Sequence, residues 1–206
     1  KRQLLHRDTF KFEEIKDYLK QIISEGIFII PNSSKTEKEI LEFSSELGLS
    51  LPYISENGAV INGLDLLNAN LPRQLILSRE KESLLKIFQN IVPIYLQKKC
   101  KWLSEMDTKN QAKILGLEDN KLKMALDRKY TIPFNFEGNK NEKNELSKII
   151  KKEGLYLQEG GRVINLTDKV NKAKALQVFV RFFMKNNKKV KTIAVGDNYN
   201  DLDMLK

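Results

Sequence analysis

The sequence predicts an α/β fold, in which a parallel sheet with covering helices is interrupted by an inserted segment of α+β type. Short apolar runs alternate with amphipathic helix patterns over residues 12–63 and again after residue 168, which is typical of parallel α/β sheets. Between these stretches the alternation becomes irregular. The chain has 206 residues, and domains of about 100 to 150 residues are common. We therefore expect a core formed by residues 1–66 and 166–206, with a second domain at 67–165.

The first segment of the core begins with a helix and a strand. Apolar residues at three- and four-residue spacing over residues 12–24 predict an amphipathic helix that ends at Gly26. The apolar run at residues 27–30 is short and typical of β structure, so it predicts a strand buried on both faces. Pro31 and the polar residues after it end this strand.

The next helix has recognisable signals at both ends. Thr36 is the predicted N-cap, since a glutamate three residues later completes a capping box, and Gly48 is the predicted end. Strand segments follow at residues 53–55 and 60–61, and an Asn-Gly pair after them indicates a hairpin or a strand edge. The buried side of the helix is expected to carry Ile40, Leu41, Phe43 and Leu47.

The inserted segment combines strand and helix patterns. A Gly-Gly turn separates its last two strand segments. Helices are expected at residues 81–90, 122–128 and 142–153, with shorter helical pieces up to Trp102 and around residues 114–116. Strands are expected near residues 74–77, 130–136, 155–157 and 163–166.

The second segment of the core ends in a cluster of carboxylates. A helix is expected over residues 172–185 and a short buried strand over 190–195, so that Asp197 follows the carboxyl end of a strand, where open α/β sheets bind ligands. Asp197, Asp201 and Asp203 repel one another unless a cation neutralises them, and oxygen ligands of this kind suit Mg²⁺. The simpler alternative is that these residues cap a helix.

Two further positions favour phosphate binding. Ser33 and Ser34 follow the other predicted core strand and open a helix, so their hydroxyl groups and the nearby amides can bind phosphate oxygens, although serines there also serve as caps. Lys172 starts a helix and can direct its ammonium group toward the sheet edge, although the chain has many surface lysines. Because the two strand ends are built alike, we favour one shared phosphate site.

The composition narrows the classes of function. The net charge is +9, but the lysines are spread over helices together with glutamates, which indicates solvated faces or attraction of a small anion rather than nucleic-acid binding. No apolar run approaches the roughly 18 to 20 residues of a membrane helix, and no signal peptide pattern is evident, so we expect a cytoplasmic protein without a membrane partner. Cys100 is the only cysteine and has no histidine near it in sequence, which argues against a catalytic thiol.

Several of these residues match the motifs of a known superfamily. Ser33, Lys172 and the string from Gly196 to Met204 resemble the second, third and fourth motifs of haloacid dehalogenase-type phosphatases. Within that superfamily, from about residue 4 to residue 205, the order and separation of four further motifs resemble the mannosyl-3-phosphoglycerate phosphatase family. These motifs lie at residues 33–36, 56–58, 115–117 and 160–162.

The resemblance implies a Rossmann-like core with an α+β cap inserted between the second and third motifs. It also implies Mg²⁺ as cofactor and a phosphorylated small molecule as substrate. Catalytic roles would fall to Ser33 and Lys172, which hold the phosphate, and to Asp201, which orients Lys172. Asp197 and Asp201 would hold the metal. Substrate-binding positions would be Ser34, Lys35, Glu56, Asn57, Gly58, Arg162 and Asn200.

The sequence also departs from the family pattern. The first motif, which supplies an aspartate nucleophile in the family, should end at Leu4-Leu5, yet the residues before it include no aspartate, and Asp8 lies past the motif. Because the chain also stops soon after the fourth motif, we expect that the core is cut at both ends. Smaller departures concern the substrate: Ala173, Asn165 and Ile132 stand where the family usually has a glycine, a histidine and an acidic residue.

The hypothesis from sequence is a Mg²⁺-dependent phosphatase that hydrolyses mannosyl-3-phosphoglycerate to mannosylglycerate and phosphate. Glucosyl-3-phosphoglycerate or another sugar phosphate is the close alternative as substrate. A catalytically inactive homologue that binds a phosphorylated metabolite is an alternative of a different class, and nucleic-acid binding through the positive charge is a third.

Overall fold

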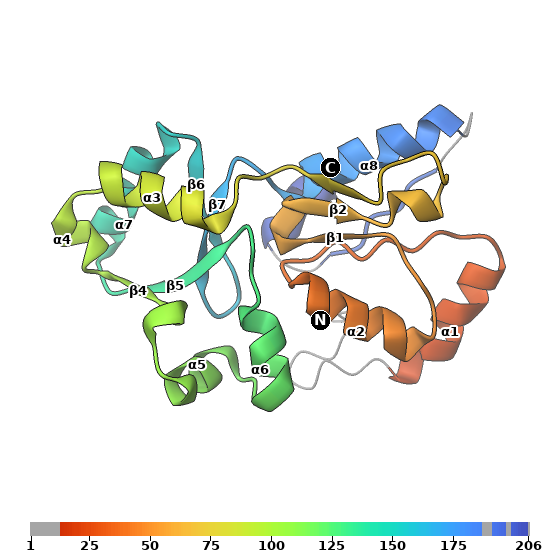
Figure 1. Cartoon of the computed structure of the whole chain (residues 1–206), viewed down its shortest axis with the longest axis horizontal. Coiled ribbons are helices and arrows are strands. Elements are labelled where there is room, and N and C mark those ends of the chain that lie inside the picture. The colour runs from red at the N-terminus through yellow and green to blue at the C-terminus, as the bar shows by residue number, and fades with distance from the viewer. Residues whose placement is uncertain (1–12, 187–190, 197–198, 206) are drawn as a thin grey trace. The chain divides into compact units, whose positions relative to one another are not determined.

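The computed structural model describes residues 13–186, 191–196 and 199–205 (Figure 1). The chain divides into unit 1, residues 1–76 with 172–206, and unit 2, residues 77–171. The boundaries expected from the sequence, at residues 66 and 165, lie earlier in the chain. Strand β3 (Gln74–Ile76) belongs to unit 1 because it pairs with β2 (Val60–Asn62).

Unit 1 contains a small antiparallel sheet of order β1-β2-β3, which begins with β1 (Tyr53–Ser55). The predicted α/β class is confirmed. Within the described residues, however, parallel pairing is limited to a single bridge between Asn32 and Ile54. The helical elements of unit 1 are α1 (Glu13–Ser24), α2 (Glu37–Leu47), α8 (Lys172–Asn186) and the short 3₁₀ turns η1 (Glu56–Gly58), η2 (Leu64–Leu66) and η4 (Tyr199–Met204).

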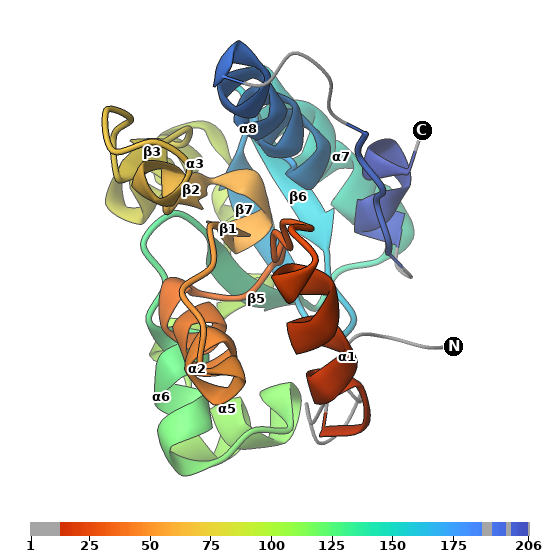
Figure 2. The same ribbon diagram turned by 90° about the vertical axis from the view of Figure 1, so that its right-hand side faces the viewer.

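Helix α2 forms where the sequence predicts it. The Thr36 hydroxyl accepts a hydrogen bond from the amide of Glu39, and the Glu39 carboxylate accepts one from the amide of Thr36, which completes the capping box. Gly48 ends the helix in the left-handed conformation. Leu41 was expected on the buried side but is 47% exposed, because it lies about 100° around the helix from the buried Ile40. Helices α1 and α2 lie side by side, joined by Leu19, Phe43, Leu47 and Leu51 (Figure 2).

Two predicted buried strands are wrong. Residues 27–30 and 191–196 have no strand structure, and the run at 27–30 exposes 53% of Ile27 and 57% of Phe28. Exposure is greater still in the second segment, at 88% for Ile193 and 83% for Val195. An apolar run becomes a strand only where another strand pairs with it, and within the described part of the chain no strand pairs with either segment.

Unit 2 is built on a four-stranded antiparallel sheet of order β4-β5-β7-β6. One face packs against helices α3 and α7 through a core that includes Leu84, Phe88, Phe134 and Ile150. The helical pieces expected up to Trp102 are present only as far as Gln97, since residues 100–102 instead form a strand that pairs with β5 and alternates between buried and exposed positions. The strands are β4 (Cys100–Trp102), β5 (Ile132–Phe136), β6 (Leu155–Glu159) and β7 (Ile164–Asp168). The helices are α3 (Lys81–Ile91), α4 (Ile94–Gln97), α5 (Thr108–Leu115), α6 (Asp119–Leu126) and α7 (Lys140–Lys151), with η3 (Leu103–Glu105) after β4.

Two features of the composition, the single cysteine and the apolar content of the helices, can be compared with the structure. Burial raises the pKa of the Cys100 thiol to about 12, so the thiol is protonated at neutral pH and is a poor nucleophile. In the part of the chain that the structure describes, no helix has both the length and the apolar character needed to cross a bilayer.

Arg79 and Asp168 join the two connections by which the chain enters and leaves unit 2. The Arg79 guanidinium donates to both carboxylate oxygens of Asp168, with Nε to Oδ2 and Nη2 to Oδ1 each 2.9 Å. The Arg79 amide donates to the same carboxylate at 2.9 Å, and the Lys169 amide donates at 2.7 Å. Burial raises the pKa of Asp168, but the hydrogen bonds together lower it by a larger amount. The pKa of Asp168 therefore lies below its usual 3.8.

We expect Asp168→Asn to reduce the free energy of unfolding of unit 2 on the order of 1 kcal/mol above about pH 4, with Arg79 partly screened by solvent. A carboxyl group whose pKa is lowered by folding stabilises the protein above its unfolded pKa, and this stabilisation is lost as the pH falls through the folded pKa. The difference between native protein and variant should therefore shrink at acidic pH. Urea unfolding followed by the fluorescence of Trp102, the only tryptophan, measures it.

The control for this prediction is Glu137→Gln, which removes an exposed ion pair with Lys101 at 3.5 Å. Exposed pairs of this kind contribute about 0–1 kcal/mol, so this variant should have a small effect at any pH. If the loss of unfolding free energy in Asp168→Asn is the same from pH 3 to pH 8, the lowered pKa assigned to Asp168 is contradicted.

Candidate active site

The segment at residues 31–35 is held beside β1 and η1 by backbone hydrogen bonds. The Ser33 amide donates to the carbonyl of Ile54, and its carbonyl accepts from the amide of Asn57, both at 3.0 Å. The Glu56 amide donates to the Lys35 carbonyl at 2.9 Å. Two predicted groups of site residues, far apart in sequence, are thereby brought side by side.

The turn η1 has an unusual backbone. Glu56, Asn57 and Gly58 are consecutive residues with positive φ, at 46°, 61° and 95°. Only glycine adopts this region freely, and a non-glycine residue there costs about 1–3 kcal/mol. Glu56 and Asn57 are nevertheless almost fully buried, at 3% and 1% exposed. Such strain persists where the surroundings require it, and it is common at functional sites.

Lys172 and Asp201 form a buried ion pair. Lys172 is the first residue of α8 and Asp201 lies in η4, and these two elements lie beside each other in unit 1. The Lys172 Nζ is 2.7 Å from the Asp201 Oδ1, and the two residues are 8% and 5% exposed. Buried charges of this kind are kept only in pairs. The predicted orientation of Lys172 by Asp201 therefore has a direct contact to support it.

Gly196 allows the chain to pass close to Asp201. A Cβ atom at Gly196 would lie 2.4 Å from the Asp201 Cβ and 2.7 Å from its Cγ, closer than such atoms approach in proteins. The glycine is thus needed for space rather than for an unusual backbone angle.

Asn32 is a residue of this site that the sequence analysis missed. Its side-chain amide Nδ2 donates to the Lys172 carbonyl at 3.0 Å and to the Met204 sulfur at 3.3 Å. The only signal in the sequence is its place as the first polar residue after the apolar run, and that signal does not show which segment it contacts.

The two serines are not the cap of α2, because Thr36 occupies that position. The Ser33 hydroxyl accepts a hydrogen bond from the Lys35 amide at 3.2 Å. Lys35 itself pairs through its ammonium group with Glu39 at 2.8 Å, so its charge is shared with α2. The capping alternative for Ser33 and Ser34 is removed, and the phosphate role remains a prediction.

In unit 2, Arg162 lies against Gly116, the residue that ends α5 in the left-handed conformation. A Cβ at Gly116 would lie 2.4 Å from the Arg162 Nη1. The motifs at residues 115–117 and 160–162 both belong to the family resemblance described above. They are therefore in contact within this unit. The substrate role of Arg162 is a prediction that this contact does not test.

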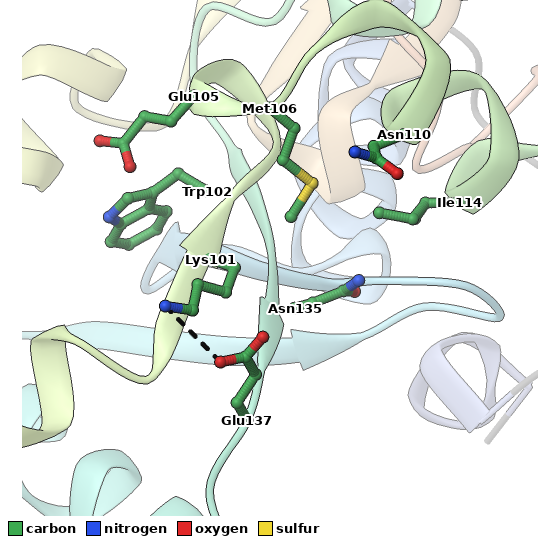
Figure 3. A pocket seen from close by; sticks show the side chains of 8 residues that line it. All are labelled: Lys101, Trp102, Glu105, Met106, Asn110, Ile114, Asn135 and Glu137. Carbon is green, nitrogen blue, oxygen red and sulfur yellow. Dashed lines mark ion pairs between the residues drawn. The ribbon is translucent and has the colours of Figure 1, made fainter.

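A pocket of about 410 Å³ lies in unit 2 between α5 and the edge of the sheet (Figure 3). Trp102, Met106 and Ile114 form part of its wall, and Lys101 and Glu137 form an ion pair across its edge. Among the predicted site residues that the structure describes, none lines it. We therefore place the candidate active site at the Lys172–Asp201 pair and not at this pocket.

The residues fit magnesium in their chemistry, but the structure describes only part of the predicted ligand set. Asp201 offers a carboxylate, and the Oδ1 of Asn32 is a buried oxygen without a hydrogen-bond partner among the described residues. Asp197, the main predicted ligand, and the side chain of Asn200 lie outside the described part of the chain. Within that part, no three acidic, histidine or cysteine side chains are grouped closely enough to hold a metal by themselves.

Comparisons with known proteins cover nearly the whole chain. A family profile described as haloacid dehalogenase-like hydrolase matches residues 4–206. The glucosyl-3-phosphoglycerate/mannosyl-3-phosphoglycerate phosphatase of Persephonella marina is 29% identical over 98% of this chain and 78% of its own length. The protein of the same name from Methanococcoides burtonii is 26% identical, with the same coverage of 98% and 78%. A haloacid dehalogenase-like hydrolase from Bacteroides thetaiotaomicron superposes with a TM-score of 0.65 at 15% identity, over 98% of this chain and 80% of that chain, which supports the fold alone.

Proposed function

The chain belongs to the haloacid dehalogenase-like hydrolases and is of the phosphatase type, and from this premise we propose that it is a Mg²⁺-dependent phosphatase of a phosphorylated sugar metabolite. The resemblance inferred from its motifs is confirmed. The observation that carries the proposal is the buried pair of Lys172 and Asp201. A lysine that a carboxylate holds in one orientation is already positioned to bind a phosphate group.

In this proposal, Ser33 and Lys172 bind the phosphate oxygens. The Ser33 hydroxyl donates a hydrogen bond, and the Lys172 ammonium neutralises negative charge that develops on the transferring group. Asp201 holds the Lys172 side chain in one orientation, with the Lys172 Nζ 2.7 Å from the Asp201 Oδ1. Magnesium, held by Asp197 with support from Asp201, would supply further charge neutralisation on the phosphate oxygens.

The attacking carboxylate is not assigned to any residue of this chain. The residues before Leu4 contain no aspartate, and Asp8 lies beyond the motif that supplies the nucleophile in the family. Hydrolysis in the family passes through a covalent bond between an aspartate and phosphorus, so the step requires a carboxylate that these residues do not provide.

We propose mannosyl-3-phosphoglycerate as the substrate, with mannosylglycerate and phosphate as products. The support for this proposal is the naming of the two relatives from Persephonella and Methanococcoides, which act on both the mannosyl and the glucosyl compound. Glucosyl-3-phosphoglycerate is therefore the alternative substrate. Arg162, which lies in unit 2, is proposed to bind a carboxylate or phosphate of the substrate.

The experiment is a phosphate-release assay of the full protein with Mg²⁺ on both compounds and on a panel of unrelated phosphomonoesters. We expect release from at least one of the two glycosyl-3-phosphoglycerates, at a rate well above the panel, and loss of release on chelation of the metal. Equal release from every phosphomonoester would contradict the substrate proposal. Binding of either compound without any release would favour the inactive binding homologue.

A further inference from the structure

We propose that Asn32 is a positioning residue for Lys172, and this inference rests on the proposed function. A single carboxamide links the three segments that carry Ser33, Lys172 and Asp201. The motifs described above do not include this residue, and the inference comes from its contacts.

The backbone at Asn32 is fixed on both sides. Asn32 forms the parallel bridge with Ile54, a residue with no exposed surface. The Ile54 amide donates to the carbonyl of Pro31 at 2.8 Å, and the Ser33 amide donates to the carbonyl of Ile54 at 3.0 Å. The Asn32 side chain therefore starts from a point that β1 holds in place.

The Asn32 amide uses its nitrogen for two acceptors. One is the carbonyl of Lys172, the first residue of α8, and the other is the sulfur of Met204, the last residue of η4. Both partners accept hydrogen bonds and neither donates them, so the NH₂ group and not the oxygen must face them. These two acceptors therefore determine which side of the Asn32 carboxamide carries the NH₂ group.

The other end of the Asn32 side chain is not satisfied by the described part of the chain. Its Oδ1 is buried and has no hydrogen-bond partner among the described residues. Leaving a buried acceptor unpaired is destabilising, so stability alone does not favour an asparagine here. The Nδ2 of Asn62 is also buried without a partner among the described residues, so the role of Asn32 follows from the two hydrogen bonds of its own Nδ2 and not from the unpaired oxygen.

Asn32 acts on the site through the backbone of Lys172. Its hydrogen bond holds the carbonyl at the start of α8, and the ammonium group of that same residue reaches Asp201. Without the bond, the first turn of α8 loses its side-chain hydrogen bond to the segment that carries Ser33. A misplacement of about 1 Å at a reacting group can reduce the rate on the order of 100-fold.

The test uses Asn32→Ala and the volume-conserving Asn32→Leu in the full protein. Asn62→Ala is the matched control, because Asn62 is a buried asparagine of unit 1 whose side chain accepts a hydrogen bond from Gln74 of β3. Three quantities are measured: kcat/KM for phosphate release, the affinity for inorganic phosphate by calorimetry, and the rate at which an amine-acylating reagent modifies Lys172, followed by peptide mass spectrometry.

We expect both Asn32 variants to lower kcat/KM by at least tenfold, to weaken phosphate binding, and to raise the modification rate of Lys172 several-fold, with none of these effects in Asn62→Ala. In a Lys172→Met background, Asn32→Ala should lower the residual kcat/KM no further, since its effect passes through Lys172. A modification rate equal to that of the native protein, or losses equal to those of Asn62→Ala, would overturn the inference.

The modification rate also separates this inference from the proposed function. It requires neither substrate nor bound phosphate, so it reports on the position of Lys172 even if the protein hydrolyses no sugar phosphate. A native protein without phosphatase activity would overturn the proposed function, whereas an unchanged modification rate would overturn only the role of Asn32.

Discussion

Replacing Asp201 with alanine is expected to lower the free energy of unfolding of unit 1 by about 3–5 kcal/mol, because it leaves the buried ammonium group of Lys172 without its counter-ion. It should also lower the rate of phosphate release on the order of 100-fold or more, because Lys172 loses the contact that orients it. Thermal or chemical unfolding and steady-state kinetics measure the two effects separately.

The double variant Lys172→Met/Asp201→Leu distinguishes stability from catalysis. Replacing both members of a buried ion pair with apolar residues of similar size is often neutral for stability. We therefore expect this double variant to recover most of the stability that Asp201→Ala loses and none of its activity. Recovery of activity in the double variant would show that the pair has only a structural role.

The control for this pair is Glu159→Gln. Glu159 pairs with Lys143 at 2.6 Å, but its side chain is 69% exposed, so water screens the interaction. Its removal should change the free energy of unfolding by less than about 1 kcal/mol and leave phosphate release unchanged.

Gly196→Ala is expected to reduce phosphate release on the order of 100-fold. The added Cβ would lie 2.4 Å from the Asp201 Cβ, an atom next to the backbone that cannot move away as a flexible chain end can. Either the loop at Gly196 or the η4 turn must then shift, and Lys172 loses its alignment with Asp201. Steady-state kinetics with and without saturating Mg²⁺ measures the effect.

Gly48→Ala is the matched control for this second prediction. Gly48 has a φ of 71°, and an added Cβ would meet nothing within 4 Å, so only backbone strain of about 1–2 kcal/mol opposes the substitution. This variant should lose stability and keep its activity. If Gly196→Ala behaves in the same way, the close approach to Asp201 has no role in function.

Local signals explain which elements could be predicted. Helix α2 begins at Thr36 and ends at Gly48 as expected, because a capping box and a left-handed glycine act within a few residues of the chain. The strands of unit 2 are also predicted close to their observed positions, with the exception of β4, whose three residues are too few for their alternation to be recognised in the sequence.

The candidate site could be predicted only in part. Ser33, Lys172 and Asp201 are predicted from the spacing of the motifs, and the structure brings Lys172 and Asp201 into contact, while their roles stay predictions. Asn32 was missed, since a hydrogen bond to a residue 140 positions away leaves no trace in the local sequence.

By itself, the sequence determined the family, the caps of helix α2 and the phosphatase type, because motif spacing, caps and apolar periodicity are properties of short stretches of chain. Only the tertiary structure decided that the apolar runs at 27–30 and 191–196 are not strands, that β3 pairs within unit 1, and that Asn32 holds Lys172. Each of these depends on which distant segment supplies a hydrogen-bond partner, and pairing between distant segments is established only when the chain folds.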